Sequence, residues 1–185
     1  MDQRIREIVN GNLSGERKAE LLKQIDLSEN DIEGNKLFSV MREIDSINLI
    51  KVENIIREHG YPGKALVGEP ANKAVFYVVQ HSDKIDQYLP LIRKAAQEGE
   101  ISNTSLAMME DRNLMDKGLE QIYGTQIRGK ANKEGKWISF LWPVKNPESV
   151  NNLRKNAGFN TTIEEYLEAM DVENKFYKLN EIDDL

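Results

Sequence analysis

Three side chains that carry acid–base chemistry interrupt stretches that otherwise have the pattern of apolar helix faces: His59, His81 and Asp111. The two histidines are the only ones in the chain. His59 ends a face predicted to be buried, whose other members recur at three- and four-residue spacing: Met41, Asp45, Asn48, Val52 and Ile55 or Ile56. Because a buried polar group without a partner costs roughly 1–3 kcal/mol, we expect these groups to meet in one pocket.

Asp111 lies in the middle of a second predicted face, which is built from Thr104, Ala107 or Met108, Leu114 or Met115, and Gly118. Neighbouring helical residues point about 100° apart, so Asp111 and Arg112 cannot form a good pair with each other. We expect Asp111 to face inward and Arg112 to lie at the edge of the face. An inward aspartate can orient a histidine by accepting its ring N–H, or it can simply tie helix ends together.

An enzyme is the first functional hypothesis. His59 or His81 would be the general base and the other the general acid, with Asp111 orienting one of them and Arg112 holding an anionic group. Such an arrangement suits a hydrolase or transferase that acts on a phosphoester or another anionic small molecule.

Two hypotheses from other classes stay open. The chain could be a non-catalytic interaction or regulatory module, similar to an immunity protein, whose acidic surface binds a partner while the polar cluster locks helices. His59, His81 and Asp111 could also form a two-histidine, one-carboxylate metal site, although no spacing requires it. We expect no cofactor, because P-loop, GxGxxG, GxSxG and HExxH patterns are missing.

The composition is typical of one globular domain spanning residues 1–185, with 39% hydrophobic and 30% charged residues. The net charge of −6 disfavours a nucleic-acid partner, and no apolar run approaches the roughly 20 residues needed to cross a membrane. Without cysteine or a signal-peptide core, we expect a cytoplasmic protein with a small-molecule or protein partner. A basic cluster over 128–136 is interpreted as a solvated hairpin loop.

The apolar periodicity predicts a mainly α fold with one β-hairpin over about residues 122–142. Its strands are predicted at 122–128 and 136–142, joined by a loop at 129–135. The acidic tail, residues 171–185, is expected to fray. Helices are predicted from Ser14 to about Ile25, from Ser28 or Asn30 to Gly60, from Glu69-Pro70 to about His81, from Ser82 or Asp83 to Gly99, from Ser102 or Asn103 to Gly118, from about Glu148 to Ala157, and from Thr162 to Met170.

Short motifs follow one another in a fixed order: His59-Gly60-Tyr61-Pro62, Gln80-His81-Ser82-Asp83, Asp111-Arg112, Gln121-Ile122-Tyr123-Gly124-Thr125-Gln126, and Arg154 with Gly158. Over residues 45–167 the chain resembles an uncharacterised, mostly bacterial family of unknown function with the motifs HG(W/Y)P, QH(A/S)D, DR and QxYGTQ. Asn151 stands where the family usually has aspartate, which removes a carboxylate. The family has no established activity, so the resemblance implies a site location and no reaction.

The segment from Gln121 to Gln126 is the strongest candidate for ligand contact. Its amide and hydroxyl side chains offer donors and acceptors beside Tyr123, and Gly124 lets a ligand or another backbone approach closely. The alternative interpretation is a glycine-containing edge strand. The full set of expected ligand-binding residues is Asn48, Gln80, Arg112, Gln121, Tyr123, Thr125, Gln126 and Arg154.

Overall fold

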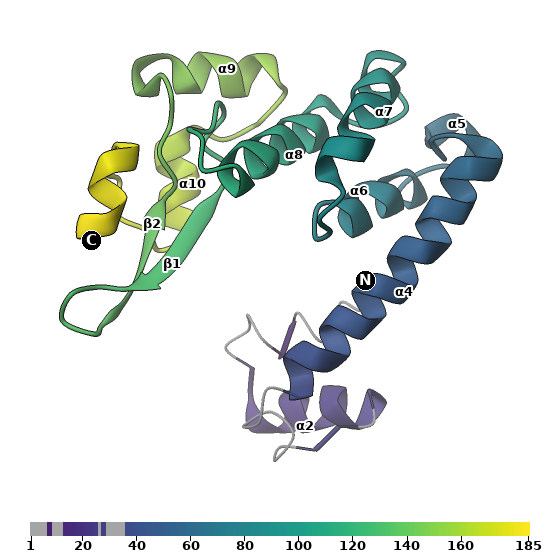
Figure 1. The fold of residues 1–185 in the computed structure, drawn as a ribbon, viewed down its shortest axis with the longest axis horizontal. Helices are drawn as coiled ribbons and strands as arrows, with labels where there is room; N and C mark the ends of the chain where they lie inside the picture. The colour runs from purple at the N-terminus through teal and green to yellow at the C-terminus, as the bar shows by residue number, and fades with distance from the viewer. Residues whose placement is uncertain (1–6, 9–12, 26, 29–35) are drawn as a thin grey trace. The chain divides into compact units, whose positions relative to one another are not determined.

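The computed structural model describes residues 7–8, 13–25, 27–28 and 36–185 (Figure 1). The chain divides into two compact units: unit 1 holds Met1–Gly60 and Tyr77–Ser82, and unit 2 holds Tyr61–Phe76 and Asp83–Leu185. The mainly α prediction is confirmed, and the described part contains a single two-stranded antiparallel sheet. Within that part, no helix has both the length and the apolar character needed to cross a bilayer. A single folding domain stays a prediction.

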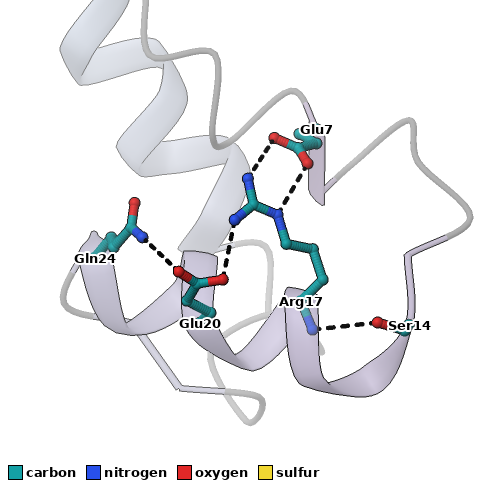
Figure 2. Close-up of polar contacts among 5 residues, drawn as sticks. All are labelled: Glu7, Ser14, Arg17, Glu20 and Gln24. Atoms are coloured by element: carbon teal, nitrogen blue, oxygen red, sulfur yellow. Dashed lines mark hydrogen bonds and ion pairs between the residues drawn. The ribbon is translucent and has the colours of Figure 1, made fainter.

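Helix α2 (Gly15–Gln24) belongs to unit 1, and its polar side chains fix its start (Figure 2). The Ser14 hydroxyl accepts a hydrogen bond from the Arg17 N–H at 3.3 Å. The Arg17 guanidinium bonds Glu20 at 2.9 Å and Glu7 at 3.2 Å. The predicted cap and the predicted helix end near residue 25 are therefore confirmed, because both follow from local chemistry.

Helix α4 (Lys36–His59) also belongs to unit 1, and its predicted start at Ser28 or Asn30 falls largely outside the described residues. Gly60 ends it with φ 73°, as predicted. Val52 is buried, but the His59 side chain is 50% exposed. The buried face is therefore wrongly predicted at His59, because periodicity fixes the side on which a residue lies and not how far the covering core extends along the helix.

The first half of unit 2 is helical. It contains α5 (Lys64–Val67), η1 (Ala71–Lys73), α6 (Ala74–Val79), which ends within unit 1, α7 (Ile85–Gln97) and α8 (Asn103–Asp116). Ser102 caps α8 as predicted, by accepting the Ser105 N–H. The cap prediction for α7 is wrong: the helix begins after Lys84, without a side-chain cap, instead of after Ser82 or Asp83. Helix α5 was not predicted, because four residues are too few for a periodic pattern.

The hairpin pairs β1 (Ile127–Ala131) with β2 (Trp137–Leu141) in antiparallel register, Ile127 facing Leu141. The first predicted strand is wrong before residue 127, because residues 122–126 form a loop that bonds to α8. The loop between the strands covers residues 132–136 and is shorter than the predicted loop over 129–135, because β1 continues to Ala131. Beyond the hairpin lie η2 (Pro147–Ser149), α9 (Val150–Asn156), α10 (Ile163–Ala169) and η3 (Leu179–Asp184).

The C-terminal segment packs on the hairpin, so the expectation that it frays is wrong. Val172 is buried in the same core as Leu141 and Leu167. Lys130 of the hairpin donates to the Ile182 carbonyl at 2.8 Å, and Lys133 pairs with Asp184 at 3.0 Å. Figure 1 shows η3 beside the two strands. Two cations of the basic cluster therefore serve to bind the acidic tail.

Candidate functional site

Asp111 is fully buried on α8, as predicted, and anchors the loop over residues 121–126. Its carboxylate accepts the backbone N–H groups of Ile122 at 2.7 Å, Tyr123 at 3.0 Å and Thr125 at 3.0 Å. The Thr125 hydroxyl adds a fourth donor at 2.9 Å. Burial raises the pKa of the Asp111 carboxyl, and these hydrogen bonds to the ionised form oppose the rise. One side chain thus accepts hydrogen bonds from three residues of the loop.

The two glutamines of the loop hold its ends together. The buried Gln121 side chain accepts the Gln126 N–H at 2.8 Å and donates to the carbonyls of Gln126 at 3.1 Å and Trp142 at 2.6 Å. The Gln126 side chain donates to the Met108 carbonyl of α8 at 3.3 Å. Both amides therefore bond to the protein itself and join the loop to α8 and to the end of β2.

Gly124 takes φ 67° and lies against a side chain of α10. A Cβ at this position would come within 2.6 Å of the Ile163 Cδ1 atom. Only glycine fits both the backbone conformation and the contact. The sequence predicts that a ligand or another part of the protein approaches Gly124 closely, and in the structure the buried Ile163 side chain does so.

Arg154 of α9 is 2% exposed and holds the loop from its other side. Its guanidinium donates to the Tyr123 carbonyl at 3.0 Å and to the carbonyl and hydroxyl of Thr161 at 3.0 and 3.1 Å. The guanidinium carbon also lies 4.7 Å from the ring centre of Phe159 and 5.3 Å from that of Tyr166. Burial lowers the pKa of Arg154. The contacts that link Asp111, the 121–126 loop and Arg154 are called the Asp111–Arg154 network below.

Arg112 and Asn151 lie near this network. The positive charges of Arg154 and Arg112 oppose the rise that burial causes in the pKa of the Tyr166 hydroxyl, so Arg112 is within electrostatic reach of that ring. Arg112 is half-buried, in line with its predicted place at the edge of the face. The Asn151 side chain accepts the Ile163 N–H at 2.8 Å and donates to Glu164 at 2.9 Å. It therefore binds the first turn of α10.

The remaining candidates belong to unit 1. His59 is exposed at the end of α4, with its Nε2 atom 3.5 Å from the Glu58 carboxylate, and His81 is partly buried just after α6. Asn48 and Gln80 are also partly buried. The described donors to Asp111, which lies in unit 2, are the loop groups named above. That the histidines and Asp111 meet in one pocket stays a prediction.

The first motif contributes a structural contact through its tyrosine. The Tyr61 hydroxyl donates to the Asn72 carbonyl at 2.6 Å, and burial raises the pKa of this hydroxyl. The Asn72 side chain in turn donates to the Glu100 carbonyl at 2.9 Å. These bonds tie the segment after α4 to η1 and to the turn that follows α7.

A cavity of about 190 Å³ opens beside the loop. Of the predicted ligand-binding side chains, Tyr123 lines it. Its other lining residues are Asn103, Leu106, Ala107, Glu110, Asn156 and Ala157. The sequence analysis missed Glu110, although it lies four residues after Leu106 and three after Ala107, at the spacing that puts residues on one helix face.

The described residues contain a second cavity but no cluster of metal-binding side chains. A larger cavity of about 530 Å³ lies where the 144–147 segment meets residues 176–180 of the tail. Among the residues that the structure describes, no group of three or more His, Cys, Asp or Glu side chains is placed to hold a metal ion.

No curated protein and no solved structure gives a significant match to the chain. One family model, described as a family of unknown function (DUF6624), matches residues 12–179. Because that match covers most of the chain, including the Asp111–Arg154 network and the cavity beside it, the protein belongs to the DUF6624 family.

Proposed function

We propose that this protein binds a small polar ligand in the cavity beside Tyr123, and that the Asp111–Arg154 network keeps the site in shape. One observation carries the proposal: the Tyr123 backbone is held at both ends, its N–H by Asp111 and its carbonyl by Arg154. The side chain of the same residue lines the cavity. A wall fixed before binding lowers the entropic cost of binding, which is how ligand sites are usually built.

We propose ligand binding and not catalysis because hydrogen-bond donors of the loop already surround the Asp111 carboxylate. A carboxylate that already accepts bonds from three N–H groups and one hydroxyl has little capacity left to orient an imidazole. Hydrolysis or transfer with His59 and His81 as acid and base stays a prediction. A cytoplasmic location is part of the proposal, since it rests on the sequence alone.

A second candidate is the non-catalytic interaction module. It is favoured by three isoleucine residues on α4, Ile47, Ile50 and Ile55, which are 45%, 59% and 41% exposed. Exposed apolar groups at helical spacing can bind a protein partner. Such a partner would bind to unit 1, whereas the proposed cavity lies within unit 2.

A thermal-shift screen of small metabolites tests the ligand proposal. A compound at 100 times its dissociation constant should stabilise the protein by about 2.7 kcal/mol. We expect the shift to disappear in Asn156→Trp and Leu106→Trp, which fill the cavity from two sides, and to persist in the His59→Gln/His81→Gln double variant. Shifts that survive both tryptophan variants but vanish in the double histidine variant would overturn the proposal, and so would a broad library without a stabilising compound.

A further inference from the structure

The residues that line the cavity beside Tyr123 carry negative charge and no positive charge. Glu110 is the one charged side chain among its lining residues, and the other polar groups are the Tyr123 hydroxyl and the amides of Asn103 and Asn156. Glu110 is largely buried, with 18% of its side chain exposed. A carboxylate in a partly desolvated wall attracts positive charge more strongly than one in bulk water does.

Glu110 already binds one cation on its outer oxygen. The Arg93 guanidinium donates to Glu110 Oε1 at 2.7 and 3.2 Å. The second oxygen, Oε2, faces the Tyr123 hydroxyl at 3.5 Å, a long contact that leaves it with acceptor capacity. Arg93 does not line the cavity. The carboxylate thus has one oxygen bound to Arg93 and one next to the Tyr123 hydroxyl.

Two further features make the cavity wall negative. Asn156 and Ala157 stand at the C-terminal end of α9, where the last carbonyl groups carry partial negative charge. Burial is the largest cause that raises the pKa of the Tyr123 hydroxyl, and the negative charges of Glu110 and Asp111 raise this pKa further. A phenol whose ionisation is opposed by its neighbours remains protonated and available as a hydrogen-bond donor or acceptor.

We propose that the ligand bound in this cavity carries an alkylammonium or guanidinium group, which contacts Glu110 Oε2 and the Tyr123 hydroxyl. The inference rests on the proposed function and names the chemical class of its ligand. A volume of about 190 Å³ equals about six water molecules at roughly 30 Å³ each, which is room for a cationic head and a short alkyl chain. Leu106 and Ala107 offer apolar surface to that chain.

Four matched probes with the same alkyl chain test the charge preference: butylguanidine, butylamine, butanol and butyrate. Binding is followed by NMR chemical-shift changes of the Tyr123 ring in the full chain. We expect the two cations to bind at least tenfold more tightly than butanol, and butyrate to bind most weakly. Equal affinities, or a preference for butyrate, would overturn the inference.

Three variants assign the preference to named groups. Glu110→Gln keeps the shape of the side chain and should weaken cation binding at least tenfold, whereas Glu168→Gln, an exposed change on α10, should leave it unaltered. Arg93→Gln frees Glu110 from its internal cation and should strengthen cation binding several-fold. The opposite effect of Arg93→Gln, a loss of cation binding, would contradict attraction of the cation by the Glu110 carboxylate and would overturn the inference.

The source of the cation is decided by a blocked tripeptide with a single arginine. Tighter binding of the peptide than of butylguanidine assigns the site to a partner's side chain, and the reverse assigns it to a free small amine; both outcomes support a cation site. Cation binding that survives Asn156→Trp lies elsewhere and overturns the inference and the proposed function together. Neutral or anionic compounds that bind to wild type but not to Asn156→Trp overturn the inference alone.

Discussion

The Asp111 carboxylate accepts two hydrogen bonds from Thr125, one from its backbone N–H at 3.0 Å and one from its hydroxyl at 2.9 Å. The two residues are 14 positions apart, on α8 and in the loop before β1. This contact fixes where the loop turns back toward the hairpin. Two residues that the sequence analysis predicts as site residues, Asp111 and Thr125, are therefore hydrogen-bonded to each other.

Replacing Asp111 by asparagine should destabilise the protein by about 2–4 kcal/mol. An amide has one acceptor oxygen and an NH₂ group that would face the loop donors, so at least one buried N–H group loses its acceptor and meets another donor instead. Urea unfolding followed by circular dichroism measures the difference. Asp116→Asn, at the exposed end of the same helix, is the matched control and should stay within about 0.5 kcal/mol of wild type.

Arg154→Lys should be nearly as harmful, by about 2–4 kcal/mol. A single ammonium group cannot reproduce the bonds to Tyr123 and Thr161 together with the ring contacts at Phe159 and Tyr166. Thermal unfolding at neutral pH is the measurement. Arg128→Lys, on the exposed side of β1, makes the same chemical change and should have no measurable effect; equal losses in both variants would contradict the role of Arg154.

Asn151→Asp should destabilise this chain by about 1 kcal/mol at neutral pH, a small effect because the Glu164 carboxylate is solvent-exposed. The hydrogen bond from Asn151 is the largest cause that lowers the pKa of Glu164. A carboxyl group whose pKa is lower in the folded protein than in the unfolded chain stabilises the protein at pH values above the unfolded pKa. This stabilisation is lost as the pH falls through the folded pKa. An aspartate would instead repel the Glu164 carboxylate 2.9 Å away.

The pH dependence separates this cause from a packing defect. The loss in Asn151→Asp should shrink as the pH falls through the ordinary carboxyl pKa of about 4, where the pair can share a proton. Unfolding curves between about pH 3.5 and 8, which cover the carboxyl titration near pH 4 and the fully ionised range above it, give the profile. Asn152→Asp, on the exposed side of α9, serves as control, and a loss that does not change with pH would rule out charge repulsion.

His59→Gln should change the free energy of unfolding by less than about 0.5 kcal/mol, because the side chain is half exposed. Chemical denaturation at neutral pH provides the value. A loss above 2 kcal/mol, the size expected for a buried polar group, would restore the interpretation that His59 belongs to a packed face.

Local features of the fold could be predicted from the sequence. Ser14, Ser102 and Thr162 cap helices because a hydroxyl needs only the N–H groups of the next turn, and Gly60 ends α4 for an equally local reason. Asp111 was correctly placed inward, since its neighbours at helical spacing are apolar.

Non-local contacts account for what was missed. Residues 122–126 alternate as a strand would, but Asp111, at least 11 residues away along the chain, satisfies their N–H groups and pulls them into a loop. The tail is ordered by Lys130 and Lys133, which no pattern within residues 171–185 reveals. Glu110 was overlooked because its importance depends on Arg93 and Tyr123, from two other segments.

Amide hydrogen exchange of the loop, measured residue by residue by NMR, tests the central claim most directly. The backbone N–H groups of Ile122, Tyr123 and Thr125 should exchange slowly in the wild-type protein, and in Asp111→Asn they should exchange far faster while the amides of α7 keep their protection. Fast exchange of these three groups in the wild type, or unchanged protection in Asp111→Asn, would contradict the claim that Asp111 holds the loop in place.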